Sequence, residues 1–398
     1  MKSSNTLFVI LIFAAIFMIG CTIDPVYYTD ENLDFYAEEQ YNEEVVDKVE
    51  EVDKVGDVEQ EFDDEFYDEE EFYDDEYFFM EPEDCFEGEK YDPVEKLCYI
   101  DCDTEEECLR IEEEISQNAE DIGEDFFEGE EDFKDIVPED ITILAKYNIN
   151  GEAIQLYEKP ALDDNSLKTL QDDSDKHQII WDRYKSLIPL SNTPFLVEYH
   201  VGTDGKEETF AAVNQNEKNL KNWDLMIDIQ DAFVSGNELD KKELTYTLIH
   251  EFGHLLTLNE KQVDLILNAD LSDDDFIRLE KNCNPNFFTR EGCTKKSSYM
   301  NLFFSKFWKG TYDEFLGFQE IEDDDEYYEA LDNFYIKYES RFVTDYAATN
   351  PGEDIAESWT AFVLQEKPNG NKISDQKAKF FYDFPELVKL RKIIRARI

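Results

Sequence analysis

The chain contains the stretch Leu248-Ile249-His250-Glu251-Phe252-Gly253-His254-Leu255, which follows the pattern H-E-x-x-H. Positions i and i+4 of an α-helix share one face, so both histidines can reach a single metal ion. The opposite face is apolar and predicts packing on a core; its members are Leu244, Leu248, Phe252 and Leu255. Asp240 and Glu243, three residues apart, form the capping box expected where such a helix begins.

The residue types in this motif predict a catalytic zinc site. Such a site has three protein ligands and keeps a fourth position open for water. Glu251 sits beside the metal, where it can accept a proton from that water. The chain has only four histidines, and the motif holds two of them. Of the others, we expect His177 on the surface and His200 in a structural role on a strand.

Two glutamates compete to be the third ligand beside His250 and His254. Glu260 occupies the position at which the metzincin pattern H-E-x-x-H-x-x-G-x-x-H has its last histidine. However, Thr257 replaces the glycine that lets the chain turn back towards the metal. The other candidate, Glu353, lies far downstream and follows Pro351, a residue that suits the first turn of a second helix.

The downstream segment carries a more specific pattern. Tyr346, Glu353 and Glu357, together with the His-Glu-Phe-Gly-His motif at 250–254, resemble the gluzincin metallopeptidases of the anthrax-lethal-factor-like branch. In that branch a tyrosine precedes the ligand glutamate by seven residues, and another acid follows it by four. The resemblance implies that Glu353 is the third zinc ligand, that Glu357 orients a ligand histidine, and that Tyr346 stabilises the oxyanion. It extends from about residue 190 to the end.

Apolar alternation predicts strands at 195–201, 209–213 and 223–230, followed by segments with mainly helical periodicity. This order indicates an α+β fold with a small sheet and a helical C-terminal part, consistent with a gluzincin-type catalytic domain at 137–398. We expect 223–230 to be the edge strand, along which an extended peptide substrate would lie. The basic segment 389–397 predicts a closing amphipathic helix.

The N-terminus has the features of an export signal. Lys2 is followed by an unbroken apolar run from Leu7 to Ile19, and Gly20 stands directly before Cys21. Residues 1–21 resemble a bacterial lipoprotein signal peptide, which implies a lipid on Cys21 and an extracytoplasmic location at a cell membrane. An uncleaved membrane anchor is the alternative, and it places the rest of the chain on the same side.

The chain is strongly acidic, with a formal net charge of -61. Residues 21–140 alone hold 51 acidic and 6 basic residues. This charge excludes nucleic acid as a partner, because phosphates would be repelled. Self-repulsion predicts that 22–83 is a disordered tether. A docking strip for a basic partner, a weak cation trap and an inhibitory pro-segment are the alternatives for this arm.

Six cysteines remain after Cys21, as expected in an oxidising compartment. We predict a disulfide between Cys283 and Cys293. Four more cysteines cluster in a small module at 84–120, and their pairing stays open; they are Cys85, Cys98, Cys102 and Cys108. Their spacing does not match the paired hooks of a zinc site, so it favours disulfides.

Together these patterns predict a surface-anchored zinc metalloendopeptidase that binds one Zn²⁺ per chain and acts on peptide or protein substrates. A catalytically silent surface scaffold or adhesin with the same fold is the main alternative. A calcium-buffering acidic surface protein is another. The residues do not predict the cleavage specificity or the oligomeric state.

Overall fold

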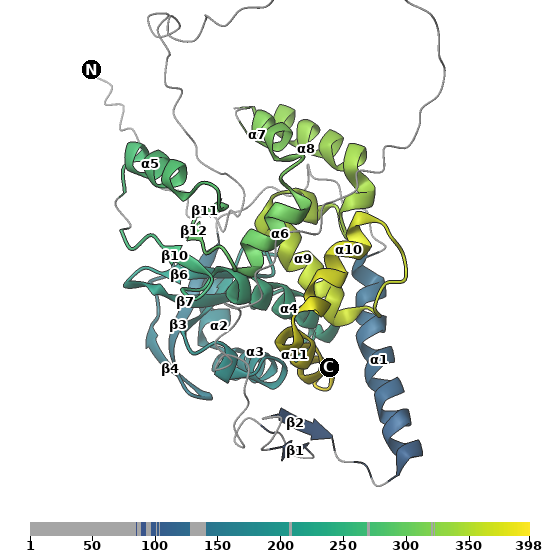
Figure 1. Cartoon of the computed structure of the whole chain (residues 1–398). Helices are drawn as coiled ribbons and strands as arrows, with labels where there is room; N and C mark the ends of the chain where they lie inside the picture. The colour runs from purple at the N-terminus through teal and green to yellow at the C-terminus, as the bar shows by residue number, and fades with distance from the viewer. Residues whose placement is uncertain are drawn as a thin grey trace, which may run out of the picture. The chain divides into compact units, whose positions relative to one another are not determined.

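The computed structural model describes residues 85, 89–92, 97–100, 102, 104–127, 141–206, 209–268, 271–319, 321 and 323–398. All of them belong to one compact unit. The predicted signal peptide, the lipid on Cys21 and the predicted tether at 22–83 lie outside these residues. The described part is an α+β structure in which a small mixed sheet is followed mainly by helices (Figure 1). Among its helices, none is long and apolar enough to cross a membrane.

The central sheet has five strands in the order β4-β3-β5-β7-β6. β5 and β7 run parallel, whereas the other neighbouring pairs are antiparallel. The three strands predicted from apolar alternation correspond to β5, β6 and β7. The strands of this sheet are β3 (Thr142–Asn150), β4 (Ala153–Glu158), β5 (Leu196–Thr203), β6 (Ala211–Asn216) and β7 (Asn219–Asp228).

Helices make up most of the remaining described chain. The α-helices are α1 (Glu105–Phe127), α2 (Asn165–Asp172), α3 (Ser174–Leu187), α4 (Lys241–Leu258), α5 (Asp273–Cys283), α6 (Tyr299–Phe307), α7 (Tyr312–Phe318), α8 (Asp324–Tyr338), α9 (Pro351–Leu364), α10 (Ile373–Phe380) and α11 (Pro385–Arg395). The described residues also form the short 3-10 helices η5 (Leu190–Asn192), η6 (Glu339–Arg341), η7 (Tyr346–Ala348) and η8 (Phe381–Asp383).

The prediction that 223–230 is the edge strand is wrong. That stretch lies mostly in β7, which has β5 on one side and β6 on the other. β6 and β7 form an antiparallel hairpin, and the hairpin places its first strand on the outside of the sheet. Alternation of apolar and polar residues within one strand predicts which side chains are buried, but it does not predict which strands lie on either side. β6 is therefore the edge strand on this side of the sheet, and β4 is the edge strand on the other side.

α3 packs on one face of the sheet. Trp181 of α3 lies beside Tyr199 of β5, with ring centroids 5.7 Å apart, and both side chains are fully buried. His177 was expected on the surface, but it is buried on the same side of α3. Its ring nitrogens lie 2.7 Å from the Tyr147 hydroxyl and 2.9 Å from the Leu170 carbonyl oxygen. Its polar neighbours in sequence misled the prediction, because the buried residues of a helix are spaced three or four apart and their direct neighbours can face solvent.

The N-terminal cysteines pair in sequence order. Disulfides join Cys85 to Cys98 and Cys102 to Cys108. The first holds the hairpin of β1 (Glu89–Asp92) and β2 (Leu97–Ile100), and the second holds the start of α1. α1 continues to Phe127 and contacts both α4 and α9. This helix therefore packs on the body of the protein rather than forming part of a separate module.

The predicted disulfide between Cys283 and Cys293 is confirmed. It ties the end of α5 to a small three-stranded sheet with the order β10-β12-β11, in the segment that follows α4. The remaining short strands are β8 (Phe233–Ser235), β9 (Glu238–Leu239), β10 (Val263–Leu265), β11 (Phe288–Thr289) and β12 (Gly292–Thr294).

The basic C-terminal segment forms α11, as predicted, and it closes the fold. Arg395 is buried, and its guanidinium donates to the carbonyl oxygens of Val363 at 3.0 Å and Leu364 at 3.1 Å. Arg391 donates to the Phe362 carbonyl at 2.6 Å. These oxygens belong to the last turn of α9, which has no intrahelical partners for them. Two arginines of α11 therefore cap α9 instead of facing a membrane.

Candidate metal centre

α4 presents two histidines on one face. Asp240 is its N-cap and accepts a hydrogen bond from the Glu243 backbone N–H at 3.2 Å, as the sequence predicts. His250 and His254 lie one turn apart, and both are buried. Their Nε2 atoms are 3.1 Å apart. The helix therefore delivers two imidazole nitrogens to one point.

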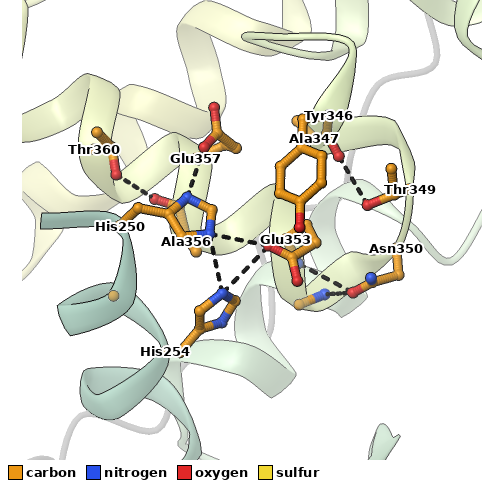
Figure 2. A network of polar contacts seen from close by, with 12 residues as sticks. His250, His254, Tyr346, Ala347, Thr349, Asn350, Glu353, Ala356, Glu357 and Thr360 are labelled. Carbon is orange, nitrogen blue, oxygen red and sulfur yellow. Dashed lines mark hydrogen bonds and ion pairs between the residues drawn. The ribbon is translucent and has the colours of Figure 1, made fainter. Parts of the chain in front are cut away.

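α9 brings a carboxylate to the same point, as Figure 2 shows. Asn350 caps this helix by accepting from the backbone N–H groups of Gly352 and Glu353. Oε2 of Glu353 lies 3.0 Å from His250 Nε2 and 3.2 Å from His254 Nε2. Glu353 is 1% exposed. Two helices far apart in the sequence thus place three donor atoms around one small space.

The spacing of these donor atoms fits a zinc ion. Ligands at about 2.0–2.1 Å from a tetrahedral zinc ion are separated from one another by roughly 3.3 Å. The three separations here are 3.0, 3.1 and 3.2 Å. The second oxygen of Glu353, Oε1, is buried and has no hydrogen-bond partner among the described residues. Two histidines and one carboxylate are also a donor set that catalytic zinc uses.

Glu357 fixes the proton position on His250. Its Oε1 lies 2.6 Å from Nδ1 of His250, on the side of the ring away from Glu353 (Figure 2). An ionised carboxylate only accepts hydrogen bonds, so the proton resides on Nδ1. The Nε2 atom of a neutral His250 then carries a lone pair directed at His254 and Glu353. A positive charge between His250, His254 and Glu353 would be attracted by the donor atoms of all three side chains.

The protonation of the centre agrees with this need for positive charge. Burial lowers the pKa of His250, but hydrogen bonds and charge from Glu353 and Glu357 outweigh burial and hold that pKa well above its usual value. Burial raises the pKa of Glu353, yet the two histidines bring it down to about 2. In the protein alone, a proton supplies the charge that a metal ion would otherwise supply.

A glycine lets the two helices meet closely enough for this arrangement. A Cβ atom at Gly253 would lie 3.0 Å from Cδ1 of Trp359 and 3.2 Å from Cα of Ala356, both on α9. The second of these is a backbone atom and cannot move without shifting α9. The glycine of the His-Glu-Phe-Gly-His motif therefore sets the distance between α4 and α9.

Glu251 lies between the histidine pair and the edge strand. The backbone N–H of Val213, on β6, lies near the Glu251 carboxyl group and partly offsets the effect of burial on its pKa. Its Oε2 atom has no hydrogen-bond partner in the described part of the chain. Burial raises the pKa of Glu251. A buried carboxyl group with one unused oxygen suits proton transfer to and from a reacting group.

Tyr346 approaches the centre from the turn before α9. It begins the 3-10 helix η7, and its ring centroid lies 5.9 Å from that of His250. The ring projects towards Glu353 in Figure 2. Asp345 and Thr349 hold the backbone of this turn, because Asp345 accepts from the Tyr346 N–H and Thr349 donates to the Tyr346 carbonyl.

Glu260, the other third-ligand candidate, does not join the centre. It lies on the surface, where its Oε2 atom is 3.1 Å from the ammonium group of Lys221. The chain leaves α4 at Asn259, whose side chain donates to the carbonyls of Leu255 and Leu256. The absence of a glycine at 257 is consistent with this course. Of the two candidates, the structure brings only Glu353 to the histidines.

Sequence reasoning missed two hydroxyl groups near the centre. The Tyr246 hydroxyl donates to Glu357 Oε2 at 2.5 Å, and the Thr344 hydroxyl donates to the same atom at 2.8 Å. Tyr246 lies four residues before His250 and so shares its helix face, a spacing that could have identified it. Thr344 carried no such signal, because its partner is set by tertiary packing.

His200 belongs to a separate polar cluster on the sheet, together with Glu198 and Asp224. Its Nε2 atom lies 3.0 Å from Glu198, which also binds Lys218 at 2.7 Å. Burial raises the pKa of Glu198, but Lys218, Tyr157 and His200 together lower it to about 2. Asp224 on the neighbouring strand is also buried, and burial raises its pKa to about 7.

A third group of acids, Asp204, Asp228 and Asp231, gathers at the end of β7. Asp228 is 1% exposed and accepts hydrogen bonds from the backbone N–H groups of Gln230 at 2.6 Å and Asp204 at 2.8 Å. These bonds hold the turn that follows the strand, which accounts for the buried carboxylate.

No family model, curated protein or solved structure matched this chain in comparisons of sequence and fold. A function for the chain therefore has to be inferred from the geometry of the centre and from the sequence patterns.

Proposed function

We propose that this chain is a zinc-dependent endopeptidase of the gluzincin type, with one Zn²⁺ held by His250, His254 and Glu353. The observation that carries the proposal is the convergence of these side chains from two helices, with donor atoms 3.0–3.2 Å apart. Glu251 adds a buried carboxyl group beside the same point. Metal ligands together with a general base are the minimum set for hydrolysis by water.

Zinc, when bound, would polarise the scissile carbonyl group and lower the pKa of a water molecule. Glu251 accepts a proton from the attacking water and passes it to the leaving amine. Its pKa, raised by burial, favours the first of these steps, because a higher pKa makes the carboxylate a stronger base. Tyr346 donates a hydrogen bond to the oxyanion that develops on the substrate. Glu357 keeps the proton of His250 on Nδ1, so that Nε2 remains available as a ligand.

We propose that an extended peptide substrate pairs with β6, in place of the stretch at 223–230 expected from sequence. β6 is a terminal strand of the sheet. An edge strand offers backbone groups to an added strand, and such addition binds peptides without strong dependence on their sequence. This strand contacts α4, and its Val213 lies near the general base Glu251. A substrate on β6 would therefore lie near the catalytic groups.

We also propose that the protein is exported and held at a bacterial cell membrane by a lipid on Cys21. The support is the sequence of residues 1–21, with its basic start, short apolar run and Gly20-Cys21 pair. In cells given an alkyne fatty acid, wild type should become labelled and Cys21→Ala should not. Labelling of both proteins would contradict the assignment of the lipid to this cysteine.

The test of the metal site is elemental analysis of the full chain beside two variants. Wild type and Glu260→Ala should each contain one zinc per chain, whereas Glu353→Ala should contain none. Glu260→Ala is the matched control, because it removes an exposed carboxylate just after α4, the helix that carries both histidines. A folded wild type that binds no zinc would overturn the proposal and favour the silent scaffold.

The test of catalysis is Glu251→Gln, assayed with a peptide library. This variant should keep its zinc and lose cleavage by roughly 10²–10⁴-fold, because it removes the general base but no ligand. Wild type that binds zinc yet matches Glu251→Gln in every cleavage assay would favour the scaffold over the peptidase.

A further inference from the structure

Glu357 connects three parts of the centre through its two oxygens. Oε1 accepts from His250 Nδ1 at 2.6 Å. Oε2 accepts from the hydroxyls of Tyr246 at 2.5 Å and Thr344 at 2.8 Å. Glu357 is 2% exposed, so these donors replace water around its charge. A buried carboxylate held at both oxygens has one orientation, which in turn fixes the orientation of the His250 ring.

Tyr246 is itself held by α1. Its ring stacks on Phe126, with centroids 4.1 Å apart and an interplanar angle of 22°, and Phe127 packs at 5.7 Å. α1 is close to α9 at another point, where a Cβ at Gly123 would lie 3.4 Å from the Leu364 side chain. A tyrosine stacked in this way keeps its hydroxyl in place at little further cost in side-chain entropy.

Thr344 connects the same carboxylate to the turn that carries Tyr346. Its hydroxyl oxygen accepts a hydrogen bond from the Ala347 backbone N–H at 3.1 Å while donating to Glu357. The orientation of the metal ligand His250 and the position of the Tyr346 turn therefore depend on one side chain.

We propose that Tyr246 is a positioning residue for the metal centre, and that the end of α1 acts on the centre by clamping Tyr246. The chain of contacts runs from Phe126 to Tyr246, to Glu357 and to His250. Without the Tyr246 hydroxyl, Oε2 of Glu357 retains only the Thr344 donor in a site that water does not reach. The carboxylate can then rotate, and His250 loses its fixed proton and direction. This inference rests on the proposed function only in assigning His250 as a metal ligand.

The experiment compares metal affinity in the full chain, measured by competition with a chromophoric chelator. Tyr246→Phe should weaken zinc binding by roughly 10- to 100-fold, the range typical for losing a partner behind a ligand. Tyr338→Phe is the matched control, because it removes an exposed hydroxyl that donates to Glu314 at 2.8 Å, and it should bind like wild type. Phe126→Leu keeps the Tyr246 hydroxyl but removes the stack, and it should weaken binding less.

The visible absorption spectrum of the Co²⁺-loaded protein supplies a readout that a loss of stability alone would not change. In Tyr246→Phe the bands should shift or broaden as His250 becomes less ordered, whereas in Tyr338→Phe they should not. Wild-type affinity together with an unchanged Co²⁺ spectrum in folded Tyr246→Phe would overturn the proposal. If wild type binds zinc tightly but cleaves no peptide, and Tyr246→Phe still binds weakly, the peptidase function fails and the positioning role stands.

Discussion

Two tyrosines reach the histidine pair by different routes, and we expect their hydroxyls to have separable effects. Tyr346 packs beside the His250 ring, whereas Tyr246 reaches that ring through the Glu357 carboxylate. Tyr346→Phe should therefore lower kcat by roughly 10²–10³-fold, as is typical for loss of an oxyanion donor. Zinc affinity and KM should change little. A variant that loses zinc but keeps kcat per bound metal would contradict the assigned role.

Asp224 gives the sheet a dependence on pH that is independent of the metal centre. Its pKa rises from 3.8 to about 7 on folding, because burial penalises the ionised form and Asn216 compensates only in part. A carboxyl group with a raised pKa contributes its full stability below the unfolded value and loses it as pH rises towards the folded value. Asp224→Asn cannot ionise, so its melting temperature relative to wild type should increase between pH 4 and pH 8. An offset that is constant across this range would contradict the assignment.

Among the elements, α4 and α9 approach each other closely at Gly253. Gly253→Ala places a methyl group 3.2 Å from Cα of Ala356, which forces the helices apart by tenths of an ångström. Because the ligands are divided between these helices, we expect lower zinc affinity as well as a lower melting temperature. Gly317→Ala is the control: it lies in α7, with nothing within 4 Å of the added methyl, and helix propensity favours alanine there. Equal zinc affinity and equal melting temperature in the two variants would show that the contact between α4 and α9 accommodates a methyl group at position 253.

The sequence predicted elements better than it predicted their neighbours. Local periodicity and capping identified α4, β5, β6 and β7, because those signals depend on residues close in the chain. Strand order was predicted wrongly at β6 and β7, since pairing is decided by contacts that no single strand encodes. The same limit explains His177, whose polar neighbours hid a buried position, and Thr344, whose partner Glu357 is thirteen residues away.

The pattern of Tyr346, Glu353 and Glu357 predicted a long-range contact better than apolar alternation predicted the strand order. The spacing of these residues led to a third-ligand candidate about one hundred residues from the motif, and the structure brings that candidate to the histidines. A short pattern succeeded here because helix geometry converts spacing into a shared face. Whether a metal and a substrate bind stays a prediction, because spacing specifies positions but not occupancy.

For the whole molecule, the position of α1 predicts where the chain can be shortened. Removal of residues 22–84 leaves α1 with its contacts to α4, α9 and α11. That deletion should keep the melting temperature and zinc affinity of wild type. Removal of residues 22–136 also takes away α1, so Tyr246 loses its stack and Arg395 loses its hydrogen bond to Ser116. We expect the second deletion to lower both quantities, and equal values for the two would show that α1 is dispensable.

The three disulfides of the described residues join cysteines that are 13, 6 and 10 positions apart, so each of them restrains only a short loop. The ligands of the proposed metal, by contrast, lie up to 103 residues apart. A bound ion would therefore act as a long-range cross-link between α4 and α9. It would reduce the conformational entropy that the unfolded chain has between these helices, which the three disulfides do not restrict. We therefore expect chelation, more than reduction, to speed hydrogen exchange in α9.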